Sequence, residues 1–292
     1  AFAHVEVPLA STFMLSTKEG KEAYVEPVIE GDSYRFEVKV GKPKNAEYAK
    51  LGTTAGKRKA FKCLMSGVPI TYDHIRAEGT AGRMGTRLMA IVVEGERGRM
   101  YLSPAPDHEE AAHNAKPEWA PDTKLHGKCR VNVSNYGIDT FADLFTPRQL
   151  VALTTFSDLV GEAMQQVRRD ALAAGLPDDP TPLRDGGTGA TAYAEAVAVY
   201  LGIALSRLSD ICNALCRWEV TKTQVRNLFG RQAIPMVWDF AENNVFAEAA
   251  GDYIVSLANM VKALERLTAA GEGLAHQADA QGQLLALNKE LS

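Results

Sequence analysis

The spacing of apolar residues changes along this chain from a strand period to a helix period, and no other feature of the sequence constrains the fold as strongly. Up to about residue 103, apolar side chains alternate with polar ones, as in Tyr34–Val40, which follows a turn at Gly31–Ser33. This alternation predicts a β-hairpin with Ala23–Ile29. From Thr146 onward the apolar residues recur at helical spacing instead. We therefore expect an α+β chain, with a β-hairpin-rich N-terminal part followed by a mainly α-helical domain.

The sequence divides into three parts. Residues 1–103 form a β-rich, basic domain, whose second predicted hairpin pairs Leu88–Val93 with Met100–Leu102. Residues 104–140 contain many turn formers and little periodicity, so we interpret them as a connector. Residues 141–292 form the helical domain.

Two long helices dominate the predicted helical domain, and a short acidic one is predicted in the connector at Asp107–Asn114. The first long helix begins with Thr146 as N-cap and Pro147 in the first helical position, and it ends at Gly175. The second, Thr191–Trp218, is apolar on most faces. We therefore expect it to be buried among other helices.

The stretch Phe229–Asn244, FGRQAIPMVWDFAENN, has helical character on both sides of Pro235. Because proline lacks a backbone donor, it kinks or ends a helix. We expect two short helices that bend at this residue and are anchored in the core by Trp238. A further helix is predicted at Asp252–Ala270 and a last amphipathic segment at Gln283–Leu291.

Positive charge is concentrated in one stretch of the N-terminal domain. Lys39–Lys62 contains eight lysines and arginines against one acidic residue, whereas residues 146–292 carry 12 basic and 17 acidic residues. Basic side chains release counterions when they bind phosphates, which favours a nucleic-acid-binding loop. A solvated surface loop is the alternative. Together with three arginines set among glycines in Ile75–Leu88, the candidate DNA-binding residues are Lys42, Lys44, Lys57, Arg58, Lys59, Arg76, Arg83 and Arg87.

No catalytic constellation is visible in the sequence. Cys212 and Cys216 lie four residues apart on a predicted helix, where they can share a metal with two further ligands. No histidine lies near them and buried free cysteines are common, which favours packing in the core. Cys63 is followed by Ser66 where a zinc knuckle has its second cysteine, and one thiolate with a hydroxyl does not hold zinc. We assign no catalytic residue, no metal and no cofactor to this chain.

Composition indicates the size of the core and the cellular compartment. The chain has 292 residues, 46% of them hydrophobic and 23% charged, which suffices for one large core or two ordinary ones. It has no run of about eighteen uncharged apolar residues, which argues against a membrane span. Its four cysteines are irregularly spaced, so we expect free thiols and a cytoplasmic protein. Because the chain begins without methionine, we also expect it to be part of a longer one.

Four strings carry a resemblance to a known family: STKEGKEAYVEPV (Ser16–Val28), IRAEGTAGRMGTRLMAIVVEGERGRMYLSP (Ile75–Pro104), YGIDTFADLFTPRQLVALTTFSDLV (Tyr136–Val160) and NLFGRQAIPMVWDFAENN (Asn227–Asn244). In this order and spacing they resemble the middle region of large bacterial adenine-specific DNA methylases that contain a zinc-ribbon segment and a domain of unknown function. The resemblance runs from the first residues to about Gln281.

The resemblance implies an S-adenosylmethionine-dependent amino-methyltransferase. Its cofactor loop, Asp-Pro-Phe-x-Gly-x-Gly, would lie upstream of the matched region, and its catalytic loop, Asp-Pro-Pro-Tyr, would lie downstream. Neither loop occurs in this chain. The chain is therefore expected to be inactive alone, because it lacks the seat for the cofactor and the groups that hold a flipped adenine.

The resemblance also implies a role for the chain within the parent enzyme. The segment between two such loops is commonly the target-recognition region, which predicts a DNA-binding insert that binds double-stranded DNA beside the missing methyltransferase segments. The family's zinc ribbon would be degenerate here, because only Cys63 of its paired cysteines remains. We expect its small sheet to persist without metal if it packs on a neighbour.

Two other interpretations stay open. The acidic, apolar-rich helical half is compatible with an interaction scaffold that packs on a methylase domain or on a partner protein of a phage-defence system. A small-molecule enzyme would instead need a closed polar pocket at Arg226, Arg231, Asp239 and Glu242. The resemblance places Arg231, Gln232, Asp239 and Glu242 shortly before the catalytic loop. We expect at least two of these four side chains to be exposed, or paired with one another, at one edge of the helical domain.

Overall fold

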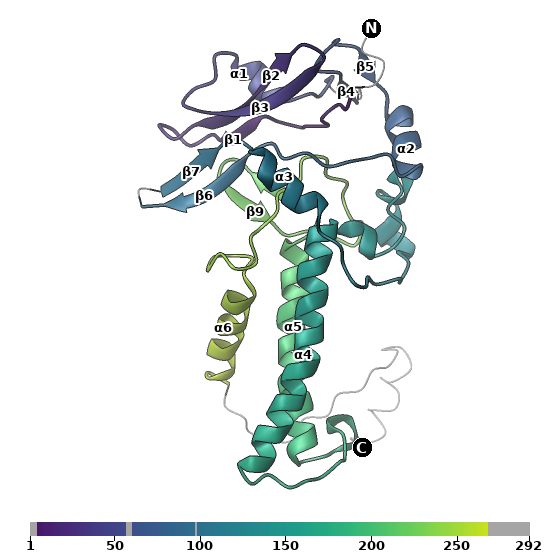
Figure 1. The fold of residues 1–292 in the computed structure, drawn as a ribbon, viewed down its shortest axis with the longest axis vertical. Helices are drawn as coiled ribbons and strands as arrows, with labels where there is room; N and C mark the ends of the chain where they lie inside the picture. Colours follow the sequence, from purple (N-terminus) through teal and green to yellow (C-terminus); the bar gives the residue numbers. More distant parts are fainter. Residues whose placement is uncertain (1–4, 57–59, 97, 268–292) are drawn as a thin grey trace, which may run out of the picture. The chain divides into compact units, whose positions relative to one another are not determined.

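The structure, a computed structural model, describes residues 5–56, 60–96 and 98–267 of the chain. Within these ranges it contains helices and small antiparallel sheets, which confirms the predicted α+β class (Figure 1). None of the described helices is long and apolar enough to cross a lipid bilayer. The chain separates into two units, Ala1–Ala258 and Asn259–Ser292.

Short antiparallel sheets make up much of the N-terminal part. Both predicted hairpins are present, since β2 pairs with β3 across a turn at Gly31 and β6 pairs with β7. In the first hairpin, Tyr34 and Phe36 alternate onto the same buried face as Val25. Phe13 completes this hydrophobic cluster. The strands are β1 (Met14–Ser16), β2 (Ala23–Glu30), β3 (Ser33–Val40), β4 (Phe61–Lys62), β5 (Pro69–Ile70), β6 (Ile91–Gly95), β7 (Gly98–Leu102), β8 (Arg217–Glu219) and β9 (Gln224–Arg226).

The basic stretch Lys39–Lys62, predicted to be a loop, contains a short helix, α1 (Ala46–Leu51). The side chain of Asn45 caps this helix by accepting a hydrogen bond from a backbone N–H three residues later (3.0 Å). Gly52 ends the helix with a φ of 59°, and a side chain there would place Cβ 2.4 Å from the carbonyl oxygen of Ala10. The helix is therefore held by its cap and by close packing, which the charge pattern of the sequence does not reveal.

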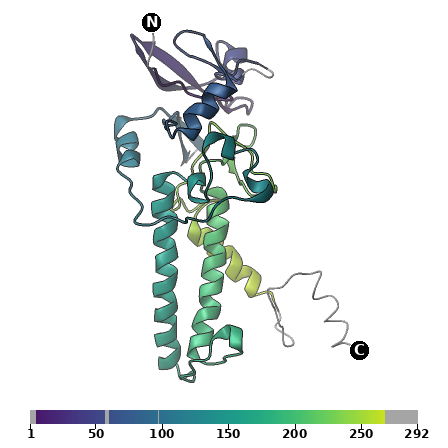
Figure 2. The ribbon, with the colours of Figure 1, turned by 90° about the vertical axis from the view of Figure 1, so that its right-hand side faces the viewer.

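Helices α4 and α5 form an antiparallel pair (Figures 1 and 2). As predicted, α4 begins after Thr146, where a capping box links the side chains and backbones of Thr146 and Gln149. The prediction for α5 is wrong in two respects: it ends at Ile211, and it is not buried on most faces. Tyr193 and Ile203 are more than half exposed, because the buried side of α5 consists largely of alanines and the larger apolar side chains point outward.

The stretch Phe229–Asn244 is not the bent pair of helices predicted from its sequence, because none of its residues is helical. Instead, its backbone forms hydrogen bonds with distant parts of the chain. For example, the N–H of Ala241 donates to the carbonyl oxygen of Cys216 (2.7 Å). Ile234 and Trp238 pack in two different hydrophobic clusters. The proline at the centre and the apolar residues around it therefore serve tertiary contacts rather than a helical repeat.

The remaining predicted helices are confirmed where the structure describes them. A short helix lies in the connector, and α6 falls within the predicted Asp252–Ala270, whereas Gln283–Leu291 lies outside the described residues. The helices after α1 are α2 (Tyr72–Thr80), α3 (Pro106–His113), α4 (Pro147–Ala173), α5 (Ala190–Ile211) and α6 (Tyr253–Leu264). Short 3-10 turns are found at Gly127–Arg130, Ser134–Tyr136, Ala142–Leu144 and Leu183–Asp185.

Candidate nucleic-acid interface and groove

Four exposed lysines lie in the segment that contains α1 and β4. The N–H of Phe13 donates a hydrogen bond to the carbonyl oxygen of Ala49 in α1 (2.8 Å), and the N–H of Lys62 in β4 donates one to the carbonyl oxygen of Thr53, just after α1 (2.8 Å). The exposed lysines are Lys42, Lys44, Lys50 and Lys62. None of them forms an ion pair with a described carboxylate. Three further candidates, Lys57, Arg58 and Lys59, lie outside the described residues.

The candidate arginines of α2 and the segment after it are already engaged. Arg76 pairs with Asp73 (3.0 Å), and Arg83 donates two hydrogen bonds to Glu78 (2.7 and 2.8 Å). The Arg83 guanidinium holds the pKa of the Glu78 carboxyl below its usual value, although slight desolvation opposes this effect. These two arginines therefore offer less free positive charge to a phosphate than the lysines do.

Arg87 has a different environment from the other two arginines. Its guanidinium lies 4.4 Å from the centre of the Tyr34 ring and donates a hydrogen bond to the Tyr34 carbonyl oxygen (2.8 Å). No described carboxylate forms an ion pair with it. Arg87 is exposed and lines a groove of about 500 Å³ beside β3.

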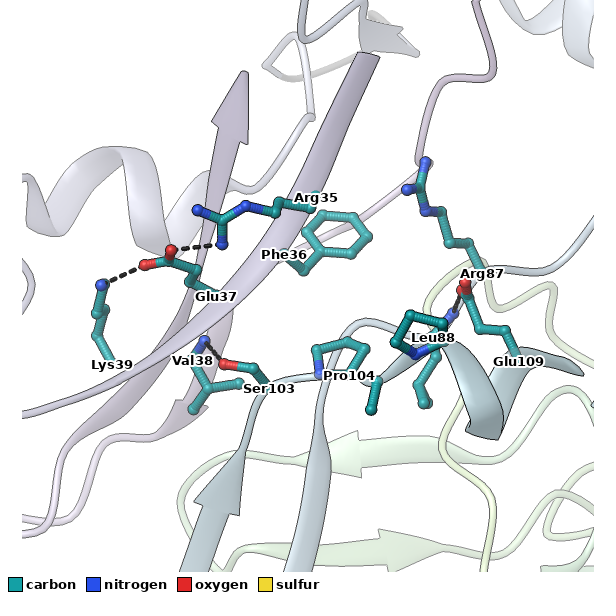
Figure 3. Close-up of a pocket in the computed structure, with 12 residues that line it drawn as sticks. Arg35, Phe36, Glu37, Val38, Lys39, Arg87, Leu88, Ser103, Pro104 and Glu109 are labelled. Carbon is teal, nitrogen blue, oxygen red and sulfur yellow. Dashed lines mark hydrogen bonds and ion pairs between the residues drawn. The ribbon is translucent and has the colours of Figure 1, made fainter. Parts of the chain in front are cut away.

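The groove is lined by both signs of charge (Figure 3). Glu37 lies between Arg35 and Lys39 and forms ion pairs with both. These contacts lower the pKa of Glu37, the hydrogen bond from Lys39 being the largest cause. Across the groove, the Glu109 carboxylate accepts a hydrogen bond from the backbone N–H of Leu88 (2.9 Å). Of the cationic side chains that line the groove, only Arg87 is thus without a described carboxylate partner.

One wall of the groove is an open edge of β3, which pairs with β2 on its other side. The backbone groups of Tyr34 and Val38 point away from β2. The carbonyl oxygen of Tyr34 accepts a hydrogen bond from Arg87, and the N–H of Val38 donates one to the Ser103 hydroxyl (2.9 Å). By the alternation of an antiparallel ladder, the backbone groups of Phe36 point the same way. Its N–H and C=O have no hydrogen-bond partner among the described residues.

The four residues expected near a catalytic loop do not converge. Arg231 and Gln232 are exposed, whereas their place at one edge of a helical domain stays a prediction. The Asp239 carboxylate instead accepts hydrogen bonds from the hydroxyl and the backbone N–H of Ser11, at 2.7 and 3.1 Å. Burial raises the pKa of Asp239, and the bonds from Ser11 oppose this effect.

Glu242 lies at the beginning of α4, and its partners differ from those of Asp239. Its carboxylate accepts a hydrogen bond from Arg148 (2.5 Å) and lies 3.5 Å from the hydroxyl of Thr146. A carboxylate at a helix N-terminus is favourable because the free N–H groups there carry partial positive charge. Arg226 pairs with Glu219 instead. The four side chains proposed for a small-molecule site, Arg226, Arg231, Asp239 and Glu242, thus bind separate structural partners or solvent.

The cysteines do not form a metal site in the described residues, where no group of three or more metal-binding side chains occurs. Cys212 caps the end of α5 and Cys216 lies beyond it, so they do not share a helical face as predicted. Burial raises the pKa of the Cys212 thiol to about 12 and that of Cys216 to about 11, which keeps both neutral. All four cysteines are free, and these two pack in the interior.

Cys63 lies in the turn between β4 and β5. Burial alone would raise the pKa of its thiol, but hydrogen bonds from the Ser66 hydroxyl and from the backbone at Ser66 and Met65 outweigh it and lower the pKa. Because this turn supplies a single sulfur, its residues do not fit a structural zinc.

Sequence reasoning missed Arg35, Lys39 and Glu109 as residues that line the groove. For Arg35 and Lys39 the available signal was the alternation of charged residues along β3, which is also typical of an ordinary solvated face, whereas Glu109 in α3 had no such signal. Comparison of the chain with protein-family models, with curated proteins and with solved structures finds no match.

Proposed function

We propose that this chain is the DNA-binding, target-recognition insert of an S-adenosylmethionine-dependent DNA adenine-N6 methyltransferase. The observation that carries this proposal is the group of exposed lysines around α1, which have no described carboxylate partner. The four strings that resemble adenine-specific DNA methylases support the same assignment. The chain would be inactive alone and would work in the cytoplasm with the methyltransferase segments that hold the cofactor.

The lysines suit contacts with phosphates rather than readout of base edges. Lysine is a compact, flexible point charge, and its ion pairs with phosphates release counterions from the duplex. Such contacts set affinity and position, whereas sequence is read by other groups. In this proposal the β4–β5 hairpin, which carries Cys63, is the metal-free remnant of the family's zinc ribbon, and its Lys62 bonds to the chain just after α1.

The proposal predicts salt-dependent binding to a short DNA duplex, measured by fluorescence anisotropy at about 50 and about 200 mM salt. The triple variant Lys42→Gln, Lys44→Gln and Lys62→Gln should bind more weakly, and the slope of log affinity against log salt should fall by about three. The matched control replaces three exposed lysines of the connector by glutamine: Lys116, Lys124 and Lys128. It changes the net charge equally and should leave most of the affinity in place.

Absence of duplex binding at the lower salt concentration would refute the proposal. So would an equal loss of affinity in both triple variants, because the binding would then follow net charge rather than this surface.

A second candidate function is a scaffold that packs on a methylase domain. The observation that favours it is the set of large apolar side chains exposed on one face of α5: Tyr193, Val199, Tyr200 and Ile203. A chain with this function alone would bind the duplex no better than the lysine variant does, so the same titration separates the two functions.

A further inference from the structure

The open edge of β3 offers a hydrogen-bond donor and acceptor from one residue, Phe36. On either side of it one backbone group is already bonded to a side chain, since Arg87 donates to the Tyr34 carbonyl oxygen and the Val38 N–H donates to the Ser103 hydroxyl. The gap between these two contacts is the groove of about 500 Å³. Such a paired donor and acceptor on an open strand edge matches the backbone of an extended peptide.

The charges in the groove indicate which side chain such a peptide would carry. Arg35 forms ion pairs with Glu30 and Glu37, and Lys39 forms one with Glu37 and lies 3.9 Å from the Glu26 carboxylate. The Glu109 carboxylate accepts a hydrogen bond from the Leu88 N–H. Arg87 keeps guanidinium N–H groups free of any described carboxylate, and its contacts with the Tyr34 ring and carbonyl oxygen hold it beside the strand edge. A planar guanidinium held in this way favours a carboxylate, which can accept two parallel hydrogen bonds.

We propose that this groove binds an extended peptide segment of a partner protein. The peptide backbone pairs with the N–H and C=O of Phe36, and an aspartate or glutamate side chain of the peptide binds Arg87. This inference removes Arg87 from the candidate DNA-binding residues and does not rest on the function proposed above.

The groove suits a peptide better than a nucleic-acid strand. Three cations and two carboxylates line it, so it lacks the large excess of positive charge that a phosphate backbone favours. A phosphodiester also accepts hydrogen bonds without donating any, so it would leave the Phe36 carbonyl oxygen without a partner, whereas a peptide backbone satisfies both groups.

The test begins with a phage-displayed library of random linear peptides selected on the immobilised full chain. Enriched peptides should share an acidic residue within a β-prone sequence. One of them, synthesised with a fluorescein label, should lose affinity about tenfold or more in the variant Arg87→Gln. The matched control Arg83→Gln changes an arginine that does not line the groove, and both it and the triple lysine variant should bind the peptide as the unmodified chain does.

A second measurement uses the unmodified chain, in case Arg87→Gln folds poorly. Addition of the labelled peptide should slow hydrogen exchange of the Phe36 amide, observed by NMR, because that N–H becomes bonded. The proposal is overturned if no acidic peptide is enriched, if Phe36 exchanges at the same rate with the peptide bound, or if a folded Arg87→Gln variant loses affinity for the duplex and not for the peptide. The last result would assign the groove to nucleic acid.

Discussion

At the scale of single residues, several polar groups of the segment 227–244 bind partners far away in the sequence. Asp239 accepts hydrogen bonds from Ser11, 228 positions earlier, and Asn243 donates one to the carbonyl oxygen of Ile211 (3.0 Å). Glu242 binds Arg148, 94 positions earlier. These side chains hold the loop in place, so their hydrogen bonds have a structural role.

Asp239 makes stability depend on pH with a definite sign. Burial raises its pKa above the ordinary value of 3.8, so the folded chain binds a proton more tightly than the unfolded chain does. The stability that comes from the protonated form is fully present below that ordinary value. It is lost as pH rises through the pKa of the folded state.

We therefore expect Asp239→Asn to flatten this part of the pH profile. The free energy of unfolding of the unmodified chain minus that of the variant should decrease as pH rises from about 4 to about 7, because asparagine does not titrate. Urea unfolding at several pH values measures this difference. A difference that is constant or grows with pH would show that the Asp239 carboxylate is not shifted upward.

At the scale of secondary structure, local signals set the position of α4. Thr146, Pro147 and Gln149 form its capping box and first turn, and they satisfy backbone groups regardless of what packs on the helix. Further along α4, Gly161 is exposed and has open space where a side chain would lie. In α2, by contrast, a Cβ on Gly79 would meet the carbonyl oxygen of Tyr136 at 2.5 Å.

These two helical glycines give opposite predictions. Gly161→Ala should raise the free energy of unfolding by about 0.5–1 kcal/mol, because alanine restricts the unfolded chain and favours the helix. Gly79→Ala should lower it by about 1–3 kcal/mol, because backbone must move to admit the methyl group. Thermal or urea unfolding of both variants provides the measurement. If both variants were less stable than the unmodified chain, the low helix propensity of Gly161 would not limit the stability of α4.

At the scale of the whole first unit, Trp238 joins parts that are far apart in the sequence. Its ring lies edge-on to Phe61 from β4, with ring centres 5.9 Å apart, and to Tyr136 from the connector at 4.8 Å. Trp218 adds a second link, since its indole N–H donates to the carbonyl oxygen of Leu15 (2.7 Å). The N-terminal sheets, the connector and the segment after α5 therefore share one set of contacts.

Because of these shared contacts, we expect Trp238→Ala to weaken the whole unit. Because Trp238 is partly buried, the loss should lie toward the lower end of the about 3–5 kcal/mol typical of large aromatic residues removed from a core. Hydrogen exchange should accelerate in both the β2–β3 hairpin and α4. The control is Trp119→Ala, since Trp119 is 44% exposed and its ring N–H bonds to Asp158. Faster exchange in only one of the two regions would contradict a shared cooperative unit.

Sequence alone determined those features that depend on neighbouring residues. The hairpin around Gly31 follows from alternation and a tight turn, and the beginning of α4 follows from Thr146 and Pro147. The sequence also showed the positive charge of Lys39–Lys62, although it did not predict the short helix within this stretch. In each of these cases the physical cause lies within a few residues of the feature that it explains.

Only tertiary contacts determined the conformation of Phe229–Asn244 and the form of the groove. A helical pattern predicted helices around Pro235, but backbone bonds to partners such as Cys216 and the packing of Trp238 between Phe61 and Tyr136 hold an irregular loop instead. The groove requires Arg87 and Ser103 to bond to the same strand edge from separate segments, while Phe36 between them stays open. Such contacts join residues that are far apart in sequence, so the spacing of residue types along the chain cannot specify them.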